Sequence, residues 1–149
     1  QVRHRGTIGG SIAHGDGASD LPAAVLALGG TIVAKGPNGE RTIAAADFFQ
    51  GFLTTALAAD DLLTEIRVPK IAGAKVAYQK FNRRAQDWAI VGVSVHASGN
   101  GTKVALVNMH PTPVRATAVE EALAFLRGAL LVSLTHQEAH SVREACPAA

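Results

Sequence analysis

The first half of the chain opens with small residues and then shows one apolar run with a helical pattern. Ser19 and Asp20 precede this run, and both residue types favour the N-cap of a helix. The run ends at Gly29-Gly30, and glycine is typical of a helix C-terminus. The pattern therefore predicts a small-residue loop at 5–12 and, after the N-cap, a helix that ends at Leu28.

Short extended segments follow this helix. Apolar and β-branched residues are separated by turn residues, which is typical of strands joined by tight turns. A small sheet with a helix over it is therefore expected in this half. The predicted elements are strands at 31–34 and 41–43 around a turn at 36–39, a short helix or loop at 47–49, and a strand at 62–68.

In the second half of the chain, apolar residues recur at every second position. Val91, Val93 and Val95 alternate with small or polar residues, and the segment 98–101 is typical of a hairpin turn. A helical period returns near the C-terminus. The predicted elements are strands at 74–81, 91–96 and 103–109, and a helix whose first turn holds a capping box of Thr117 and Glu120.

These patterns predict an α+β fold in two units. The best boundary is Ile71-Ala72-Gly73, where the period changes. We therefore expect one unit at 1–70 and a second at 71–149, the latter with three antiparallel strands and a helix.

Composition limits the classes of function. Hydrophobic residues make up 48% and charged residues 17% of 149, so a packed core is expected rather than disorder. The net charge of +2 and an aromatic content of 5% argue against a nucleic-acid groove, which needs clustered cations and stacking rings. The single cysteine, Cys146, excludes an intrachain disulfide and a cysteine cluster for a metal.

Targeting signals are not found in the sequence. No uninterrupted apolar run is long enough to span a membrane, and the residues from Gln1 lack the apolar stretch of a signal peptide. A cytoplasmic location is therefore expected. The start without methionine is typical of a cut inside a longer protein.

The segment from Thr7 to Ser11 is the strongest candidate for chemistry. Two adjacent glycines allow a ligand to approach the backbone closely, and the hydroxyl groups of Thr7 and Ser11 flank them. Successive backbone amides in such a loop suit the oxygens of a diphosphate. The alternative is a tight turn without a ligand, and the pattern alone favours that turn.

Two other constellations are weaker. His136 and His140 have the spacing of zinc ligands on a helix, but the sequence offers no obvious third ligand, and a polar helix face explains them better. Ser11, His14 and Asp16 (or Asp20) are the residue types of a hydrolytic triad. They lie in one short segment without a nucleophile elbow, which argues against hydrolysis.

Short motifs of glycine, acidic and aromatic residues occur in a fixed order along about residues 1–125. They are Arg5–Asp16, Ala18–Ala24, Asp47–Phe49, Leu62–Pro69, Tyr78–Phe81 with Arg83-Arg84, Asp87–Val91 and Pro111–Ala116. Together they closely resemble the FAD-binding medium subunit of molybdenum hydroxylases, the family of aerobic carbon monoxide dehydrogenase and xanthine dehydrogenase. The resemblance implies the second subdomain of a bipartite FAD-binding domain, followed by a small antiparallel sheet with a helix. The N-terminal FAD subdomain and part of the C-terminal domain would be missing.

The resemblance also implies roles for nine residues toward FAD. Asp20 would contact polar groups of the cofactor, and Leu63 would lie against the flavin or present its backbone to it. Lys80 would lie near the polar edge of the flavin, and Trp88 beside the isoalloxazine. The residues that would wrap the diphosphate are Thr7, Ile8, Gly9, Gly10 and Ser11.

Each of three roles has a structural alternative. Asp20 is also a good helix cap, and Lys80 could be a solvated strand residue. Trp88 could be a core anchor between the two units.

For the whole protein the resemblance implies an oxidoreductase subunit that relays electrons. Electrons would pass from a molybdopterin-containing large subunit through an iron–sulfur small subunit to FAD, and then to NAD, a quinone or dioxygen. No residue of this chain would be catalytic, and no metal, nucleic acid or membrane is implied as a ligand. The resemblance leaves open whether the chain forms a homodimer. The main alternative is a truncated interaction module that no longer holds FAD. A more remote alternative is another flavoprotein with the same FAD domain. The motifs at 87–89 and 111–115 argue against it.

Overall fold

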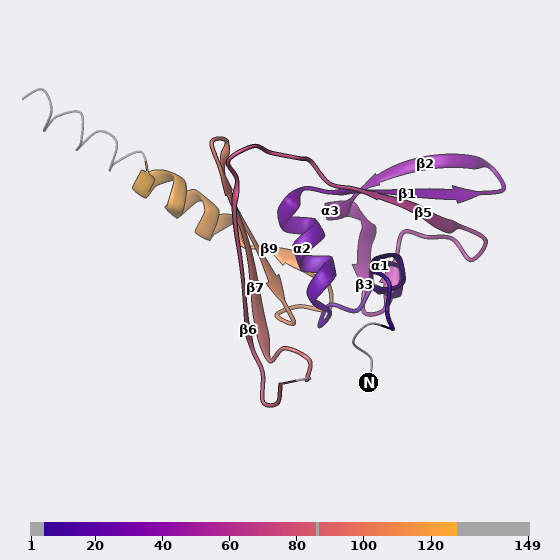
Figure 1. Ribbon diagram of the computed structural model, residues 1–149. Coiled ribbons are helices and arrows are strands. Elements are labelled where there is room, and N and C mark those ends of the chain that lie inside the picture. The colour runs from indigo at the N-terminus through magenta and orange to yellow at the C-terminus, as the bar shows by residue number, and fades with distance from the viewer. Residues whose placement is uncertain (1–4, 86, 128–149) are drawn as a thin grey trace, which may run out of the picture.

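The computed structural model describes residues 5–85 and 87–127, which form helices and small antiparallel sheets (Figure 1). The arrangement is the α+β class that the sequence predicts. The helices are α1 (Ile8–His14), α2 (Asp20–Leu28) and α3 (Ala45–Phe48), with a further helical segment at 117–127. The strands are β1 (Thr31–Gly36), β2 (Gly39–Ala44), β3 (Phe49–Gly51), β4 (Thr54–Thr55), β5 (Leu62–Arg67), β6 (Lys75–Phe81), β7 (Val91–Ser98), β8 (Gly101–Val107) and β9 (Val114–Arg115).

The first sheet has the strand order β2-β1-β5, and β1 is antiparallel to both neighbours. β1 and β2 form the predicted hairpin. Gly39 in its turn has a φ of 106°, which glycine adopts without steric strain. The central strand β1 carries three consecutive residues with no exposed surface, Ile32, Val33 and Ala34. The separate pair of β3 with β4 was not predicted, because strands of three and two residues are too short to show a period.

The second sheet has the strand order β6-β7-β8-β9, with every neighbouring pair antiparallel. Its first three strands are the predicted ones, and the two-residue β9 is an addition. The hairpin between β7 and β8 closes at the pair Ser98 and Gly101, as predicted. Along β7 the buried residues are Gly92, Ser94 and His96, while the alternating valines are only partly buried. The face with small and polar residues is therefore the inner one.

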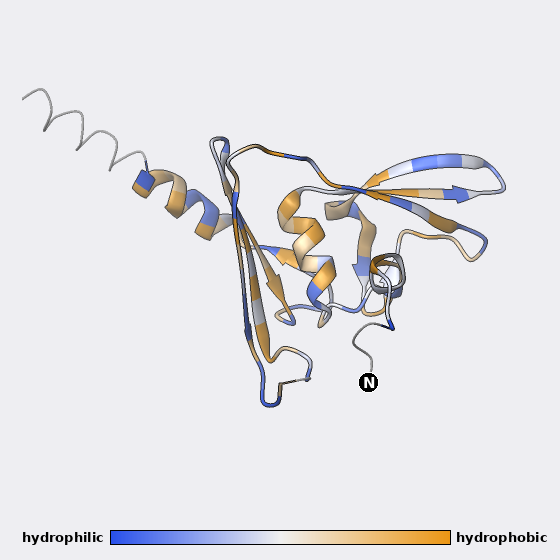
Figure 2. Ribbon diagram, viewed as in Figure 1, coloured by the Kyte–Doolittle hydropathy of each residue, from blue (hydrophilic) through white to orange (hydrophobic). Residues whose placement is uncertain are grey.

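Helix α2 connects the two larger sheets through a shared core. It packs against β7 and β8 and lies between the second sheet and the elements around β1 and α3 (Figure 1). Apolar residues dominate most of its length (Figure 2). One cluster of buried residues draws on both halves of the chain: Ile12, Ala23, Val25, Leu26, Ala27, Ile32, Ala45, Phe48, Phe49, Ala89, Ala105 and Val107.

A backbone hydrogen bond forms a second junction between the two halves of the chain. The amide of Asn108, after β8, donates to the carbonyl of Gly17, between α1 and α2, at 2.9 Å. A Cβ atom at Gly17 would lie 2.6 Å from the carbonyl oxygen of Pro111, a separation too short for real atoms. Only glycine therefore allows these two loops to approach so closely.

The predicted capping box near the C-terminus is not formed. Glu120 accepts hydrogen bonds at its Oε1 from the backbone amide of Val104 at 2.8 Å and from Arg115 Nε at 2.6 Å. Its Oε2 accepts from Arg115 Nη2 at 2.5 Å. Glu120 therefore holds the helical segment 117–127 to β8 and β9 instead of capping it. Within the described ranges, no helix is long and apolar enough to cross a membrane.

Candidate cofactor-binding site

In the segment predicted as a loop at 5–12, the residues from Ile8 onward instead form the start of helix α1. Thr7 is the N-cap residue, and its Oγ1 accepts from the amide of Gly10 at 3.0 Å. The amide of Ser11 donates to the Thr7 carbonyl at 3.1 Å. Local capping by Thr7 overrides the low helix propensity of the two glycines. The first amides of the helix, those of Ile8 and Gly9, have no partner within the helix, because a helix cannot supply one there.

Glycine keeps the backbone of α1 accessible at its first turn. A Cβ atom added at Gly9 would meet only Leu63 Cδ2, at 3.9 Å, which is ordinary contact. At Gly10 it would lie 3.1 Å from Thr7 Oγ1 and would crowd the cap. The contact at Gly9 also shows that Leu63 of β5 lies beside the start of α1. The structure thus brings together the glycine pair and Leu63, which are more than fifty positions apart in the sequence.

A hydroxyl pair joins α1 to α2. Ser11 Oγ lies 2.8 Å from Ser19 Oγ. Ser19 occupies the N-cap position of α2, but its side chain makes no capping bond to that helix. The predicted cap residue therefore fixes the position of α1 relative to α2. The next residue is Asp20, which is the first residue of α2.

Asp20 contacts the second sheet through two side chains of β6, and we call these three residues the Asp20 cluster. Tyr78 donates its hydroxyl hydrogen to Asp20 Oδ1 at 2.6 Å, and Lys80 Nζ donates to Oδ2 at 3.1 Å. Asp20 is therefore not the side-chain cap of α2, and Lys80 is not a free solvated residue. Burial, together with the hydrogen bond to Asp20, raises the pKa of Tyr78.

The Asp20 cluster depends on a glycine in the neighbouring strand. Gly92 of β7 pairs with Lys80 of β6. A Cβ atom at Gly92 would lie 3.0 Å from the hydroxyl oxygen of Tyr78. The absence of a side chain there leaves room for the phenol to extend across the sheet to Asp20. Tyr78 was missed as a site residue, although its position two residues before Lys80 places both on one face of the strand.

Trp88 lies in the loop between β6 and β7 and is 71% exposed. The alternative that it anchors a core between the units is therefore wrong. Its neighbour Ala89 is 2% exposed and belongs to the shared core. The Ala89 carbonyl accepts from Asn108 Nδ2 at 2.7 Å, so the backbone of this loop is held in place beside the exposed ring.

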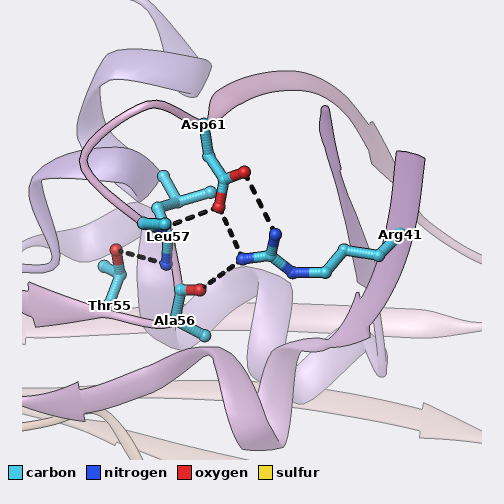
Figure 3. A network of polar contacts seen from close by, with 6 residues as sticks. Arg41, Thr55, Ala56, Leu57 and Asp61 are labelled. Carbon is cyan, nitrogen blue, oxygen red and sulfur yellow. Dashed lines mark hydrogen bonds and ion pairs between the residues drawn. The ribbon is translucent and has the colours of Figure 1, made fainter. Parts of the chain in front are cut away.

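A further polar network, missed by sequence reasoning, fixes the loop before β5 (Figure 3). Arg41 of β2 donates from Nη1 and Nη2 to the two oxygens of Asp61 at 3.0 and 2.5 Å, and from Nη2 to the carbonyl of Ala56 at 2.8 Å. The amide of Ala58 donates to Asp61 Oδ2 at 2.7 Å. The hydrogen bond from Arg41 lowers the pKa of Asp61. This network holds the chain where β5 begins, one residue before Leu62 and close to Leu63.

The candidate metal ligands and triad residues of the sequence analysis give no further site among the described residues. Among the residues that the structure describes, no group of three or more His, Cys, Asp and Glu side chains could hold a metal ion. His136, His140 and Cys146 lie outside the described residues. Asp16 accepts from the amide of Ala18 at 2.9 Å, as a loop residue does.

Two family models match the chain. The model described as the FAD binding domain in molybdopterin dehydrogenase matches residues 1–71. The model described as the CO dehydrogenase flavoprotein C-terminal domain matches residues 76–145. Nearly the whole chain is therefore accounted for by two domains of one kind of flavoprotein.

Curated relatives and solved structures agree with these models. The carbon monoxide dehydrogenase medium chain of Hydrogenophaga pseudoflava is 46% identical over 121 residues, which are 77% of this chain and 42% of the relative. The glyceraldehyde dehydrogenase medium chain of Sulfolobus acidocaldarius is 41% identical over 126 residues, 81% of this chain and 45% of the relative. The chain thus spans less than half the length of these relatives.

A solved carbon monoxide dehydrogenase from Hydrogenophaga pseudoflava, which lacks the Mo-pyranopterin moiety of its cofactor, matches with a TM-score of 0.78 and 46% identity. The match covers 83% of this chain and 45% of that one. The homologues are oxidoreductase subunits, and the fold of this chain is theirs. The chain therefore belongs to the FAD-binding medium subunits of the molybdenum hydroxylases, the family that includes carbon monoxide dehydrogenase and xanthine dehydrogenase.

Proposed function

We propose that this chain contributes one side of an FAD site in the flavoprotein subunit of a molybdenum hydroxylase. The observation that carries the proposal is the match of the FAD-binding family model to residues 1–71, which contain the Thr7–Ser11 segment. The geometry supports it, because the backbone of Gly9 is open to a ligand and Leu63 lies beside it. The residues present therefore fit a dinucleotide cofactor.

The first turn of α1 would hold the diphosphate. The amides of Ile8 and Gly9 lack partners in the helix and can donate to phosphate oxygens, which the positive end of the helix also favours. The hydroxyl groups of Thr7 and Ser11 can donate as well. Each also has a bond within the protein, to Gly10 and Ser19 respectively, which fixes its position before a ligand arrives.

The Asp20 cluster, Leu63 and Trp88 would hold the flavin end of the cofactor. The isoalloxazine, when bound, supplies the chemistry of accepting and passing on electrons. Asp20 and Lys80 offer a hydrogen-bond acceptor and a cation to its polar edge, and Tyr78 fixes the orientation of the Asp20 carboxylate. The exposed ring of Trp88 is available for stacking, and the isobutyl group of Leu63 for apolar contact.

The proposal extends to the whole protein. A subunit of this family would relay electrons from iron–sulfur clusters of a small subunit, reduced by a molybdopterin-containing large subunit, to an acceptor in the cytoplasm. The names of the relatives, medium chains, support partners of other sizes. We further propose that the chain divides at 71–73 into the second FAD subdomain and a partial C-terminal domain.

Addition of FAD to the purified chain, followed by desalting and a visible absorption spectrum, tests the proposal. The titration is repeated with the N-terminal half of a medium-chain relative supplied as a second polypeptide. We expect flavin to be retained at least in the mixture. Retention in neither sample would contradict the proposal and favour the non-catalytic interaction module.

Gly9→Ala separates cofactor binding from folding. The fold has room for the added methyl group, since its nearest neighbour would be Leu63 Cδ2 at 3.9 Å. A diphosphate lying against the Gly9 backbone does not have that room, and we expect FAD affinity to fall at least about tenfold with unchanged circular dichroism. Gly99→Ala is the matched control, because nothing lies within 4 Å of its added Cβ atom. Equal FAD affinities of the two variants would contradict the assignment of the diphosphate to the first turn of α1.

A further inference from the structure

Asn108, the residue after β8, joins two loops that come from different halves of the chain. Its backbone amide donates to the carbonyl of Gly17, between α1 and α2, at 2.9 Å. Its side-chain Nδ2 donates to the carbonyl of Ala89, in the loop between β6 and β7, at 2.7 Å. Gly17 and Ala89 are both buried, and the carbonyl of a buried residue needs a protein partner in place of water. One residue therefore supplies the partner in both loops.

The backbone of Asn108 has the left-handed conformation, with a φ of 58°. Most residues other than glycine adopt this conformation at a steric cost, and asparagine is among the few that adopt it readily. Glycine would retain the backbone bond to Gly17 without that cost, but it has no side-chain amide for Ala89. Asn108 thus combines a left-handed turn with a side-chain donor, and such a conformation at a non-glycine residue points to a role for its side chain.

The peptide group between Ala89 and Ile90 is held from both sides. Its carbonyl accepts from Asn108, and its amide, that of Ile90, donates to the carbonyl of Phe81 at the end of β6 at 2.8 Å. The side chain of Ala89 belongs to the shared core. Trp88 directly precedes this peptide group and is exposed. The loop therefore presents an exposed ring from a backbone that is fixed to the ends of β6 and β8.

We propose that Asn108 is a positioning residue, which sets residues 87–90 (the Trp88 loop) against the loop between α1 and α2. Its two hydrogen bonds connect Gly17, after α1, to the residue after Trp88. The importance of this position for FAD rests on the proposed function, which assigns the diphosphate to α1 and the flavin to Trp88. A ligand that contacts both ends of a site binds more tightly when their spacing is fixed before it arrives.

Asn108→Gly tests the side-chain bond alone. Glycine adopts this φ without strain and retains the amide that donates to Gly17, so only the bond to Ala89 is lost. Amide hydrogen exchange of Ile90, measured by NMR on the ¹⁵N-labelled chain, reports the opening of the peptide group that Asn108 holds. We expect this exchange to accelerate about threefold to tenfold, the effect of one net hydrogen bond. Asn108→Asp keeps the shape of the side chain but replaces the Nδ2 donor by an oxygen, and should accelerate exchange at Ile90 at least as much.

An internal reference separates positioning from general stability. The amide of Ala45 donates to the carbonyl of Gly30 at 2.9 Å, in the first half of the chain. Its exchange should be the same in Asn108→Gly as in the parent chain, because the lost bond holds only the Trp88 loop. Equal acceleration of exchange at Ile90 and Ala45 would overturn the proposal, since Asn108 would then stabilise the whole fold without positioning the loop.

Asn100→Gly is the matched control. Asn100 lies in the turn between β7 and β8, at the far end of both strands from Trp88. Its backbone amide donates to Ser98 Oγ at 3.3 Å, a bond that glycine retains. We expect exchange at Ile90 to keep its parental rate in this variant. Equal rates at Ile90 in the two glycine variants would also overturn the proposal.

Cofactor binding gives a second readout, which a purely structural bond would not change. FAD is added at about ten times its dissociation constant to the mixture with the N-terminal half of a medium-chain relative. Because FAD would bind only the closed Trp88 loop, exchange at Ile90 should slow about tenfold in the parent chain and in Asn108→Gly. Retained flavin with unchanged exchange at Ile90 would overturn the role of the loop in the site. If no sample retains flavin, the proposed function is contradicted, whereas the exchange rates without FAD still decide whether Asn108 positions the loop.

Discussion

The central strands of the two larger sheets differ in what they bury. In β1, Ile32, Val33 and Ala34 have no exposed surface, so the buried residues are the apolar ones. In β7 the buried residues are Gly92, Ser94 and His96, and the valines between them are half-buried. Hydrophobicity therefore marks the inner face of the first sheet but not that of the second.

Helix α2 explains the difference. It packs against β7 and β8, and its small residues Ala24 and Ala27 line a cavity that it shares with β6 and β7. Gly92 leaves room for Tyr78, and the alanines of α2 leave a cavity beside His96. Apolar packing between the second sheet and α2 is thus less close where the polar side chains of the sheet lie. Binding sites commonly show such a departure from a regular core.

Two phenylalanines test this comparison with the largest expected effect. Phe48 in α3 is fully buried in the shared core, and Phe81 at the end of β6 is 66% exposed. Phe48→Ala should lower the free energy of unfolding by about 3–5 kcal/mol, because it removes apolar contacts and leaves a cavity. Phe81→Ala should lower it by less than about 1 kcal/mol. Denaturant unfolding measures both, and equal losses would mean that the second sheet buries its outer face as fully as the first.

Glu120 offers a sharper test of how the second sheet is held, with a smaller effect. Glu120→Gln removes the charge and one of the two acceptor oxygens that bind Val104 and Arg115, so at least one of the three hydrogen bonds is lost and the others become neutral on the acceptor side. The free energy of unfolding should fall by about 1–3 kcal/mol. Glu121→Gln is the control, because Glu121 is exposed. A similar loss in both variants would show that the network does not stabilise the sheet.

The pH dependence of this loss has a definite sign. The hydrogen bond from Arg115 lowers the pKa of Glu120 in the folded chain. The carboxylate therefore adds stability above its unfolded pKa of about 4.3, and this stability is lost as the pH falls through the lower folded value. The difference between parent and Glu120→Gln should be full at neutral pH and shrink in acid. A constant difference would assign the effect to packing.

Local signals predicted most of the fold. Glycine pairs, turn residues and periods of two identified α2, the β1-β2 hairpin, β5 and the first three strands of the second sheet. The errors have physical causes. Thr7 caps a helix where glycines suggested a loop, and Glu120 binds a strand amide rather than its own helix. The first is a local capping bond that outweighs the helix-breaking tendency of the glycines. The second is a bond to the backbone of a distant strand, which spacing in the sequence does not show.

The candidate site was predicted in part. The structure brings Gly9 close to Leu63, Ser11 to Ser19 and Asp20 to Lys80. These are contacts between separate elements, and the residues were chosen through a family resemblance rather than through a pattern. Tyr78 was missed because its role depends on the space left by Gly92 in the neighbouring strand. The local sequence around Tyr78 gives no sign of that space.

Tyr78 provides the smallest and most specific test, since it joins the two units at a polar contact. Tyr78→Phe keeps the ring and removes the hydrogen bond to Asp20, so the free energy of unfolding should fall by about 0.5–1.5 kcal/mol. Asp20→Ala, which removes the acceptor, and the double variant complete a mutant cycle, and a coupling energy near zero would mean that the contact does not hold the two halves of the chain together.

Titration adds a second readout for Tyr78, because it is the one tyrosine of the sequence and its near-ultraviolet absorbance can be followed directly. Burial and the bond to Asp20 raise its pKa, so the stability they add is present below the unfolded pKa of about 10 and is lost as the pH rises through the folded value. Asp20→Asn should lower that pKa only in part, since burial remains the larger cause.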